Sequence, residues 1–514
     1  MAETEKCAGR TMAHWALPLM ALVILLLRYR YYYEPLDNDI PIRIAYAVRA
    51  LAGDSYYSDL IVFGPPGALW VHELFVALVG ANYTTVYIIG SVFSIITLLG
   101  VYRVTKLLVG YQGAILSALT WAVLSGDFFT QANQPNAEVF INAAFVWAFA
   151  LLFNQQPRRY LVNSIAAGLL FFFASSVKHF TLVVPVVAFV ANVFFALKKE
   201  QSSPIRITNK SVSAWLAAGT TVAVCWIILV VGYGFDGRLA VFADAMFGDS
   251  IRYAASNRYG FFYNFYRGVW FDYLLPSHQR PFIGLHIALL AAIVLGLRWT
   301  KDWRWRALVG WFIGTWLSVS FPGRFFPHYY MLWMPLLSIG VGCLFGLAKH
   351  IKRPKFNYGF QVALTLVLGA IIVRQVVLVA KYDTDGASRA KYGVLGEVFR
   401  ETRDIGFNLI RKLPATQSVF EIGAHGLYFY AQRIPPAPFV DSLYSHSHPT
   451  KYTEIMGGVL RHSPPDILVI RRSYLAGGSN HPLAHFAHDF LRAHIYKENN
   501  DLSGKHLVVM VRQG

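Results

Sequence analysis

Long apolar runs separated by short charged segments dominate the first 381 residues. Eleven of these runs approach the roughly 20 apolar residues that a membrane-spanning helix needs. They cover residues 14–33, 84–104, 112–126, 137–153, 160–175, 178–197, 212–234, 283–299, 306–321, 329–348 and 359–381. The first run is long and no small-residue cleavage site follows it, so we expect a signal anchor. The pattern predicts an all-α polytopic membrane domain over residues 1–381, with about 11 transmembrane helices and outer-face juxtamembrane helices.

Residues 382–514 lack such runs and alternate between helix-like and strand-like stretches. Amphipathic patterns predict helices near 395–412, 424–431, 449–461 and 482–494. Short apolar runs between them predict strands at 418–423, 438–444, 467–472 and 507–512. We therefore expect a C-terminal soluble α/β domain with a largely buried sheet.

The composition supports a membrane protein. Of the 514 residues, 55% are hydrophobic and only 14% are charged, whereas soluble domains have about 25% charged residues. These values exclude a disordered chain and disfavour an ordinary soluble enzyme. The three cysteines are too few and too scattered for a disulfide framework or a zinc site.

The net charge of +18 fits either nucleic-acid binding or a membrane protein with basic cytoplasmic loops, and the positions of the charges decide between them. The basic residues gather in every second predicted loop, as the positive-inside rule requires. They are Lys6, Arg10, Arg103, Lys106, Arg158, Arg159, Lys198, Lys199, Arg206, Lys210, Arg298, Lys301, Arg304, Arg306, Lys349, Lys352, Arg353 and Lys355. We expect a multi-pass protein of a bacterial inner (plasma) membrane with a cytoplasmic N-terminus and no nucleic-acid partner.

In this topology the outer, extracytoplasmic side carries a first loop at 34–83, a second large loop at 235–282 and the tail 382–514. Residues 65–80 (PPGALWVHELFVALVG) are almost apolar enough to span. They are short, begin with two prolines and contain His72 and Glu73, so we interpret them as a helix lying at the outer surface. If this segment crossed the membrane, every later loop would lie on the opposite side of the membrane.

Acidic residues cluster directly after the first run. Glu34, Asp37 and Asp39 stand within RYRYYYEPLDNDIP, where their charges repel one another. A functional interpretation makes one of them a general base, or makes the cluster a ligand for a sugar hydroxyl or a divalent metal cation held by Asp37 and Asp39. The alternative is a solvated loop in which Asp39 caps a helix that has Pro41 in its first turn.

Further polar residues fall at predicted outer helix ends. Glu138 lies in the first turn of a predicted span, where it needs a cavity, a partner or the helix dipole. Lys178, in SSVKHFTLVVPV, opposes the positive-inside trend and either snorkels or binds an anion.

The stretch GRFFPHYYMLWMP (323–335) lies at the predicted outer end of a later span. It contains Arg324 and His328 next to Tyr329 and Tyr330. An aromatic belt explains the two tyrosines but not the arginine and histidine. The loop 235–282 adds four further arginines: Arg252, Arg258, Arg267 and Arg280. Cations gathered near carboxylates suit a lipid-phosphate substrate, in which the cations hold the phosphate and a carboxylate takes a hydroxyl proton.

These stretches resemble the polytopic GT-C glycosyltransferases. The chain is most similar to bacterial members of the dolichyl-phosphate-mannose protein mannosyltransferase and aminoarabinose transferase superfamily (glycosyltransferase family 39-like). The resemblance is carried, in order, by four stretches: DND followed by AYAVRALAGDSYYSDLIVFGPPGALW; PNAEVFINAAFVWAFALL; SSVKHFTLVVPV; and GRFFPHYYMLWMPLL. It covers residues 14 to about 381 and fits the C-terminal domain less specifically.

The resemblance implies a transfer of sugar from a polyprenyl-phosphate (undecaprenyl-phosphate in bacteria) donor, with inversion, to a hydroxyl or phosphate of an envelope acceptor. It places catalytic acids at Asp39, at Asp37 as the close alternative, and at Glu138. It places substrate-phosphate contacts at Lys178, Arg324, His328, Tyr329 and Tyr330.

Two positions depart from the family pattern. Many relatives have Lys before the Pro-Pro pair where this chain has Gly64, and the family often has Asp-Glu where this chain has Asp37-Asn38-Asp39. Phosphate contact would then rest on Lys178 and the outer-loop arginines, among which we favour Arg258. No cofactor is required by the sequence, although a divalent cation remains possible.

Two other function classes compete with the transferase. A lipid-linked-sugar transporter or flippase would show internal repeats and ionisable residues near the midplane of its spans, whereas here the polar groups lie at the outer rim. A non-catalytic envelope assembly protein would tolerate the loss of Asp39 or Lys178. The tail also carries His446 and His448 in SHSHP, which form either a metal site or a histidine-containing loop. The sequence names neither the sugar nor the acceptor, which could be an envelope lipid such as lipid A in lipopolysaccharide, a glycan or a protein.

Overall fold

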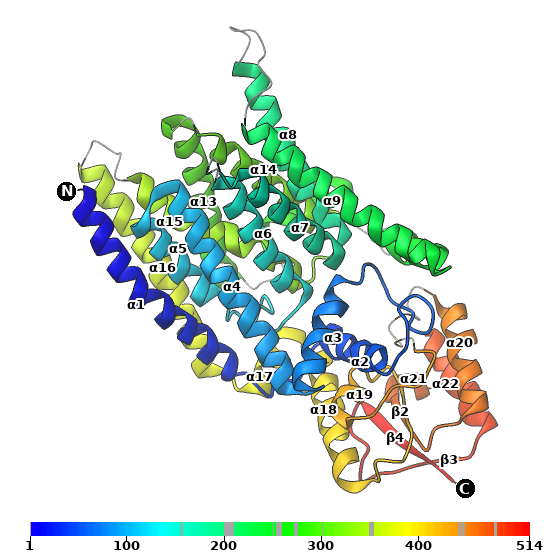
Figure 1. Cartoon of the computed structure of the whole chain (residues 1–514). Helices are drawn as coiled ribbons and strands as arrows, with labels where there is room; N and C mark the ends of the chain where they lie inside the picture. Colours follow the sequence, from blue (N-terminus) through cyan, green and yellow to red (C-terminus); the bar gives the residue numbers. More distant parts are fainter. Residues whose placement is uncertain are drawn as a thin grey trace. The chain divides into compact units, whose positions relative to one another are not determined.

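The computed structural model shows a chain of helices and one small sheet (Figure 1). It describes residues 2–154, 156, 158–199, 210–249, 251–252, 260–271, 276–300, 302–348, 354–439, 441, 444, 448–476 and 481–513. The chain divides into two compact units, each built from three separate segments. Unit 1 comprises Met1–Arg30, Gly90–Phe235 and Ala254–Lys381, and unit 2 comprises Tyr31–Ile89, Asp236–Tyr253 and Tyr382–Gly514.

All regular secondary-structure elements among the described residues of unit 1 are helices. Its elements are α1 (Ala2–Tyr29), most of α4 (Tyr83–Val109), α5 (Tyr111–Leu124), α6 (Ala137–Phe153), α7 (Tyr160–Val177), η1 (His179–Leu182), α8 (Val183–Lys199), α9 (Lys210–Phe235), α12 (Phe261–Trp270), α13 (Pro276–Thr300), α14 (Trp303–Ser320), η3 (Pro327–Trp333), α15 (Met334–Ala348) and α16 (Pro354–Lys381). Each of the eleven predicted apolar runs forms a helix, which confirms these element predictions. The runs 178–197 and 329–348 each begin with a 3-10 turn.

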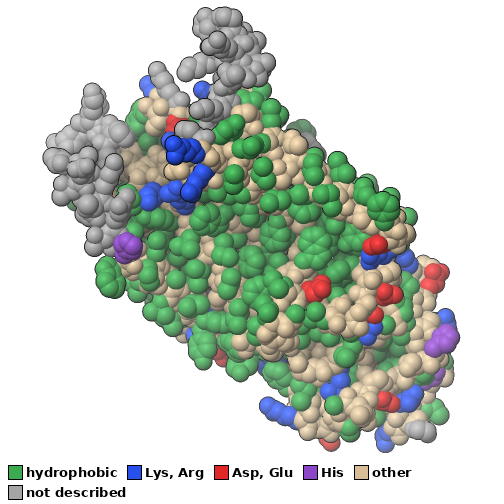
Figure 2. Space-filling model, in the orientation of Figure 1, with side chains coloured by type: hydrophobic (Ala, Val, Ile, Leu, Met, Phe, Trp, Pro, Cys, Tyr) green, Lys and Arg blue, Asp and Glu red, His purple; other side chains and the backbone are tan. Residues whose placement is uncertain are grey.

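Seven helices among the described residues are long and apolar enough to cross a membrane. They are Met12–Tyr29, Tyr83–Val109, Tyr160–Val177, Ser211–Phe235, Gln279–Thr300, Pro327–Ala348 and Tyr358–Lys381. Shorter apolar helices include α5 and α6, while α14 carries Arg304 and Arg306 in its first turn. Apolar side chains cover much of the visible surface in Figure 2, as expected of a surface that contacts lipid. The chain is a multi-pass membrane protein, and the number of eleven spans stays a prediction.

Small residues allow several helices of unit 1 to pack closely. α5 lies against α15, α6 against α7, and α8 against α14. At the α5–α15 contact, a Cβ atom on Gly342 would lie 2.1 Å from the carbonyl oxygen of Gly113. Close backbone approach at small residues is the usual way in which membrane helices associate.

Unit 2 combines the first predicted outer loop, part of the second and the C-terminal tail. Its helices are α2 (Asp39–Leu51), α3 (Gly67–Val79), α10 (Leu239–Ala243), the π-helical turn η2 (Asp244–Gly248), α17 (Thr384–Tyr392), α18 (Val394–Lys412), α19 (Leu427–Ala431), α20 (Pro449–His462), α21 (Arg472–Leu475) and α22 (Pro482–Ala493). We predicted one membrane domain at 1–381 and one tail domain at 382–514. The contacts group parts of both outer loops with the tail, and one junction between the units falls between Lys381 and Tyr382.

A four-stranded mixed sheet forms the core of the C-terminal tail. The strands β1 (Val419–Ile422), β2 (Ile467–Arg471), β3 (Tyr496–Glu498) and β4 (Leu507–Arg512) lie in the order β1-β2-β4-β3. β1 and β2 are parallel, whereas β4 is antiparallel to both of its neighbours. Helices cover both faces, so the central strands are apolar on both sides and the predicted buried sheet is confirmed.

Alternate strand residues define the two faces of the sheet. Phe420 and Leu468 pack with residues of α20 and α22, while Val419 and Val469 pack with residues of α18 and α19. The strand predicted at 438–444 was wrong, because its described residues join no strand of the sheet. Phe439 instead makes an isolated bridge with Leu60 from the first loop.

Candidate functional site

Glu138 and Lys178 form a buried ion pair in unit 1. Lys178 Nζ lies 2.5 Å from Glu138 Oε1, and the Glu138 side chain is fully buried. Glu138 stands in the first turn of α6, and Lys178 is the extended residue at which α7 ends and η1 begins. The lysine explains how an acid is tolerated at this helix end, which the sequence ascribed to a cavity, a partner or the helix dipole.

The pair retains hydrogen-bonding capacity. Glu138 Oε2 is buried and has no hydrogen-bond partner among the described residues. An ammonium group has three donor hydrogens, and Glu138 Oε1 takes one of them. The Lys178 ammonium also lies 4.2 Å from the centre of the Tyr329 ring, a cation–π distance. The arrangement therefore presents a positioned cation and an acceptor oxygen side by side.

The 3-10 helix η3 brings His328 and Tyr329 to the same place. Asn142 Nδ2 of α6 donates to the Met331 carbonyl oxygen at 2.8 Å and ties η3 to α6. His328 Nδ1 lies 2.7 Å from Gln131 Oε1, and the His328 and Tyr329 ring centres are 4.9 Å apart. The structure thus brings together Glu138, Lys178, His328 and Tyr329 from three different segments.

Tyr330 and Arg324 have different surroundings. The Tyr330 hydroxyl donates to the Arg267 carbonyl oxygen at 2.7 Å, and its buried ring packs 4.7 Å from Phe271. Arg324 is half-buried in the turn between α14 and η3, next to Phe325. Arg258, the outer-loop arginine that the sequence favoured, lies outside the described residues.

Backbone strain accompanies this cluster. Gln131 and Phe325 have φ values of 60° and 51°, in the left-handed region that non-glycine residues rarely adopt. Gln131 contacts His328, and Phe325 lies two residues before the start of η3. Residues held in such conformations concentrate at functional sites, because the surrounding structure must stabilise them.

Two buried arginines that the sequence analysis missed hold the loop before α6. Arg28 of α1 donates to the carbonyl oxygens of Ser125 at 2.8 Å and Ala132 at 2.9 Å. Arg374 of α16 pairs with the fully buried Asp127. An arginine inside the apolar run 359–381 was itself a signal, because charged residues in spans face a partner. These contacts fix the loop that leads into Glu138.

In unit 2, the three first-loop acids have different environments. Glu34 is buried and pairs with Lys391 of α17. Asp37 is mostly buried, and the Tyr392 hydroxyl lies 3.5 Å from its Oδ2. Burial and the nearby acids raise the pKa of Tyr392 well above its usual value, so its hydroxyl stays protonated and able to donate. Asp39 is the most accessible of the three, with 35% of its side chain exposed.

Asp39 begins helix α2 but does not cap it. The N-cap is Asn38, whose side chain makes no capping hydrogen bond, so the capping interpretation of Asp39 was wrong. Asp39 Oδ2 instead pairs with Arg43 at 2.5 Å one turn later, and its backbone N–H donates to Asp37 Oδ1 at 3.1 Å. A carboxylate that is accessible and held by one arginine retains capacity for another ligand.

Gly64 adopts a backbone conformation that favours glycine. Its φ is +65°, where glycine is favoured, and no atom lies within 4 Å of a Cβ built on it. Its carbonyl oxygen accepts from the Tyr57 hydroxyl at 2.7 Å. Its backbone N–H also donates to the Ala245 carbonyl oxygen at 3.2 Å, so the contacts of Gly64 are made by its backbone.

Known proteins support this fold. Residues 64–231 match the family model described as dolichyl-phosphate-mannose-protein mannosyltransferase. A crystal structure of ArnT from Cupriavidus metallidurans bound to undecaprenyl phosphate superposes with a TM-score of 0.61 at 15% identity, covering 97% of this chain and 98% of that one. Part of the chain thus matches this mannosyltransferase family model, and the chain shares the fold of the ArnT structure.

Two structures of the Archaeoglobus fulgidus oligosaccharyltransferase are also similar. One, tethered to an acceptor peptide, has a TM-score of 0.52 at 11% identity and covers all of this chain and 75% of that one. The other, in complex with zinc and sulfate, has a TM-score of 0.51 at 12% identity and covers 97% of this chain and 73% of that one. No curated protein matches the chain by sequence. The likeness to known proteins therefore rests on three-dimensional structure and one partial family match.

Proposed function

We propose that this chain is an inverting membrane glycosyltransferase that uses a polyprenyl-phosphate-linked sugar. The acceptor is a hydroxyl or phosphate of a cell-envelope lipid, glycan or protein, on the outer face of a bacterial plasma membrane. The observation that carries this proposal is the buried Lys178–Glu138 pair beside Tyr329, in a chain with the GT-C fold. The ArnT structure with undecaprenyl phosphate supports the class of donor.

Lys178 holds the donor phosphate in this proposal. Glu138 and the Tyr329 ring fix the position of its ammonium, and in this proposal its remaining hydrogens donate to the phosphate. Charge-assisted hydrogen bonds to phosphate are short and strong, and they become stronger as negative charge develops on the leaving group. His328, Arg324 and Arg258 are further proposed phosphate contacts. Tyr330 serves to position η3, because its hydroxyl already bonds to Arg267.

A first-loop carboxylate acts on the acceptor. Asp39, with Asp37 as the alternative, takes the proton from the acceptor hydroxyl as its oxygen attacks the anomeric carbon. The bond from that carbon to the phosphate oxygen breaks, and polyprenyl phosphate leaves with its electron pair. Attack from the side opposite the leaving group inverts the anomeric centre. Glu138 Oε2 is available to accept from a sugar hydroxyl.

The test is turnover of a panel of polyprenyl-phosphate sugars by the purified chain in lipid vesicles, with envelope extract as acceptor. Asp39→Asn is compared with Asp54→Asn, which removes the acid of a similar pair (with Arg49) at the other end of α2. A general base contributes about 10²–10⁴-fold, so we expect Asp39→Asn to lose at least 100-fold and Asp54→Asn to remain near native.

Other outcomes redirect the assignment. Release of polyprenyl phosphate that survives Asp39→Asn but not Asp37→Asn moves the base to Asp37. Release that survives both changes but not Glu138→Gln moves it to Glu138. No release from any donor by folded protein contradicts the proposed function and favours the transporter or assembly alternatives.

A further inference from the structure

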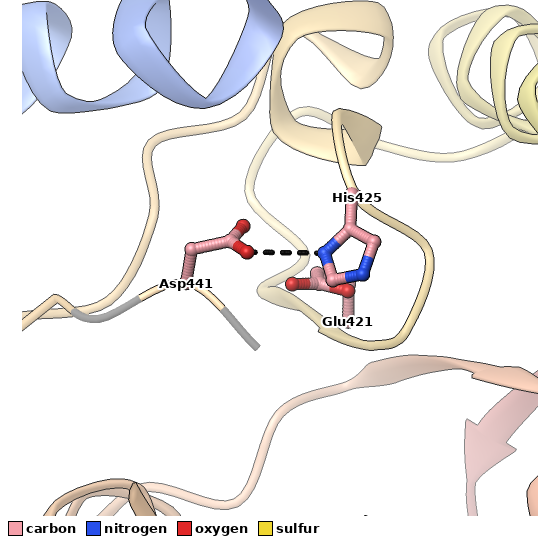
Figure 3. A group of neighbouring side chains, drawn as sticks. All are labelled: Glu421, His425 and Asp441. Carbon is pink, nitrogen blue, oxygen red and sulfur yellow. Dashed lines mark hydrogen bonds and ion pairs between the residues drawn. The ribbon is translucent and has the colours of Figure 1, made fainter. Parts of the chain in front are cut away.

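Three chelating side chains meet inside unit 2. Glu421 belongs to β1, His425 to the turn after it, and Asp441 to the segment after α19 (Figure 3). Each offers one ligand atom, and these atoms all lie within 4.8 Å of one another. His425 Nδ1 and Asp441 Oδ1 are 3.0 Å apart.

The cluster is enclosed by protein. Glu421 and Asp441 are 3% and 5% exposed, and the side chain of His425 is 9% exposed. Two carboxylates buried side by side are costly unless positive charge accompanies them. Burial lowers the pKa of His425 and so does Arg471, but the charges of Asp441 and Glu421 outweigh them and raise that pKa above its usual value. The Ala424 backbone N–H, which donates to Glu421 Oε2 at 2.8 Å, supplies a further partial positive charge.

We propose that Glu421, His425 and Asp441 bind a divalent transition-metal ion, with zinc as the leading candidate. One neutral imidazole and two carboxylates give a donor set with a charge of −2, which a divalent ion balances. Zinc accepts this combination of nitrogen and oxygen ligands at about 2.0–2.2 Å. The present spacing of up to 4.8 Å lets the three atoms surround one ion after small rotations of the side chains.

The imidazole distinguishes between classes of metal. Magnesium and calcium prefer six or more oxygen ligands, whereas imidazole suits zinc and its first-row neighbours. Three protein ligands fill three of the four positions of a tetrahedral zinc ion and leave one for a water molecule. This site differs from the Asp37–Asp39 pair, which offers carboxylates alone.

An ion here would join three segments of unit 2. The Asp441 segment includes Phe439, whose backbone pairs with Asp59 and Ile61 of the first loop at 2.9 Å and 3.0 Å. The Asp441 backbone N–H also lies 3.5 Å from the Tyr46 hydroxyl of α2. Metal bound to Asp441 would thus fix the first loop to the sheet of the tail, a structural role independent of the proposed transfer reaction.

The experiment uses the full-length chain in detergent after removal of metal with a chelator. Zinc is added by dialysis and counted by mass spectrometry, and cobalt binding is followed by visible absorption. We expect one equivalent of tight zinc and a cobalt spectrum of low coordination number. His425→Gln and Asp441→Asn should each weaken binding at least tenfold, whereas His462→Gln, an exposed histidine of the same domain, should not.

A second variant covers the case in which these changes disturb folding. Asp441→Cys keeps a ligand at this position and should add a thiolate-to-cobalt absorption band that the native chain lacks. Absence of stoichiometric metal in the folded native chain overturns the site. So does unchanged binding in His425→Gln, or binding that only Asp37→Asn or Asp39→Asn abolishes. Failure of the transfer assay leaves these results unaffected, since no turnover is measured.

Discussion

The ammonium group of Lys391 lies against the carboxylate of Glu34, and each side chain is only 1% exposed. The acid follows the first predicted span, and the lysine lies in the last turn of α17, the first helix of the tail. The pair therefore neutralises one of the three first-loop acids with a residue far away in the sequence. Asp37 and Asp39, with other surroundings, remain the candidates for chemistry.

Removing Lys391 should destabilise unit 2 strongly. Lys391→Met leaves Glu34 charged and buried without this cation, a change that costs about 3–5 kcal/mol in buried pairs. Thermal unfolding in detergent, followed by loss of tertiary signal, measures the effect. Arg472→Met is the control, because its pair with Glu498 is largely exposed and should contribute about 0–1 kcal/mol. Equal shifts in the two variants would contradict the importance of burial.

The Lys178–Glu138 pair allows stability and activity to be separated. Lys178→Met leaves a buried carboxylate without its cation and should lower the unfolding temperature. Adding Glu138→Gln removes that charge, so the double variant should regain part of the lost stability. If Lys178 holds phosphate, turnover should stay at least 100-fold below native in both variants. Recovery of turnover together with stability would assign the pair a structural role only.

The close contact between α5 and α15 depends on glycine. In Gly342→Ala, the new methyl group would meet the Gly113 carbonyl oxygen at 2.1 Å, so the helices must separate. We expect a loss of about 1–3 kcal/mol, measured as a lower unfolding temperature in detergent. Gly369→Ala in α16 is the matched control, since no atom lies within 4 Å of its added Cβ. That variant should unfold at or slightly above the native temperature, because alanine favours helix more than glycine.

The hydrogen bonds of Asp466 should make the stability of the tail depend on pH. The backbone N–H of Ser418 donates to Asp466 Oδ2 at 2.8 Å, and the Ser418 hydroxyl does so at 2.9 Å. These bonds, the backbone bond first, lower the pKa of Asp466 below its usual value of about 3.9. A lowered acid pKa stabilises the fold above the unfolded pKa and loses that effect as pH falls through the folded pKa.

Asp466→Asn should therefore unfold at a lower temperature than native near pH 7, and the difference should shrink below about pH 4. Circular dichroism melts between pH 3 and pH 7 measure this difference. The exposed Asp501, changed to Asn, serves as the reference. A difference between native and Asp466→Asn that does not vary with pH would exclude ionisation as its source.

Periodicity along the chain predicted the helices of unit 1, because each apolar run contains its own helical signal. It failed at 438–444, where an apolar run resembles a strand but Phe439 pairs with Leu60 of a distant loop. The ion-pair partners of Glu34 and Asp127 could likewise not be predicted, because no sequence pattern near either acid indicates Lys391 or Arg374. Glu138 and Lys178 were each singled out at helix ends. That they form one ion pair appeared only in three dimensions.

The three-segment composition of unit 2 has a practical consequence for anyone who isolates its parts. Phe429 and Tyr430 of the tail pack in one apolar cluster with Ile40 and Ile44 of α2, and Lys391 would lose Glu34 in a fragment that begins at Tyr382. In such a fragment the apolar side chains of Phe429 and Tyr430 would be exposed to solvent, and Lys391 would lack its carboxylate partner. The tail is therefore not a detachable module, and a protease cut near residue 381 should leave the pieces associated.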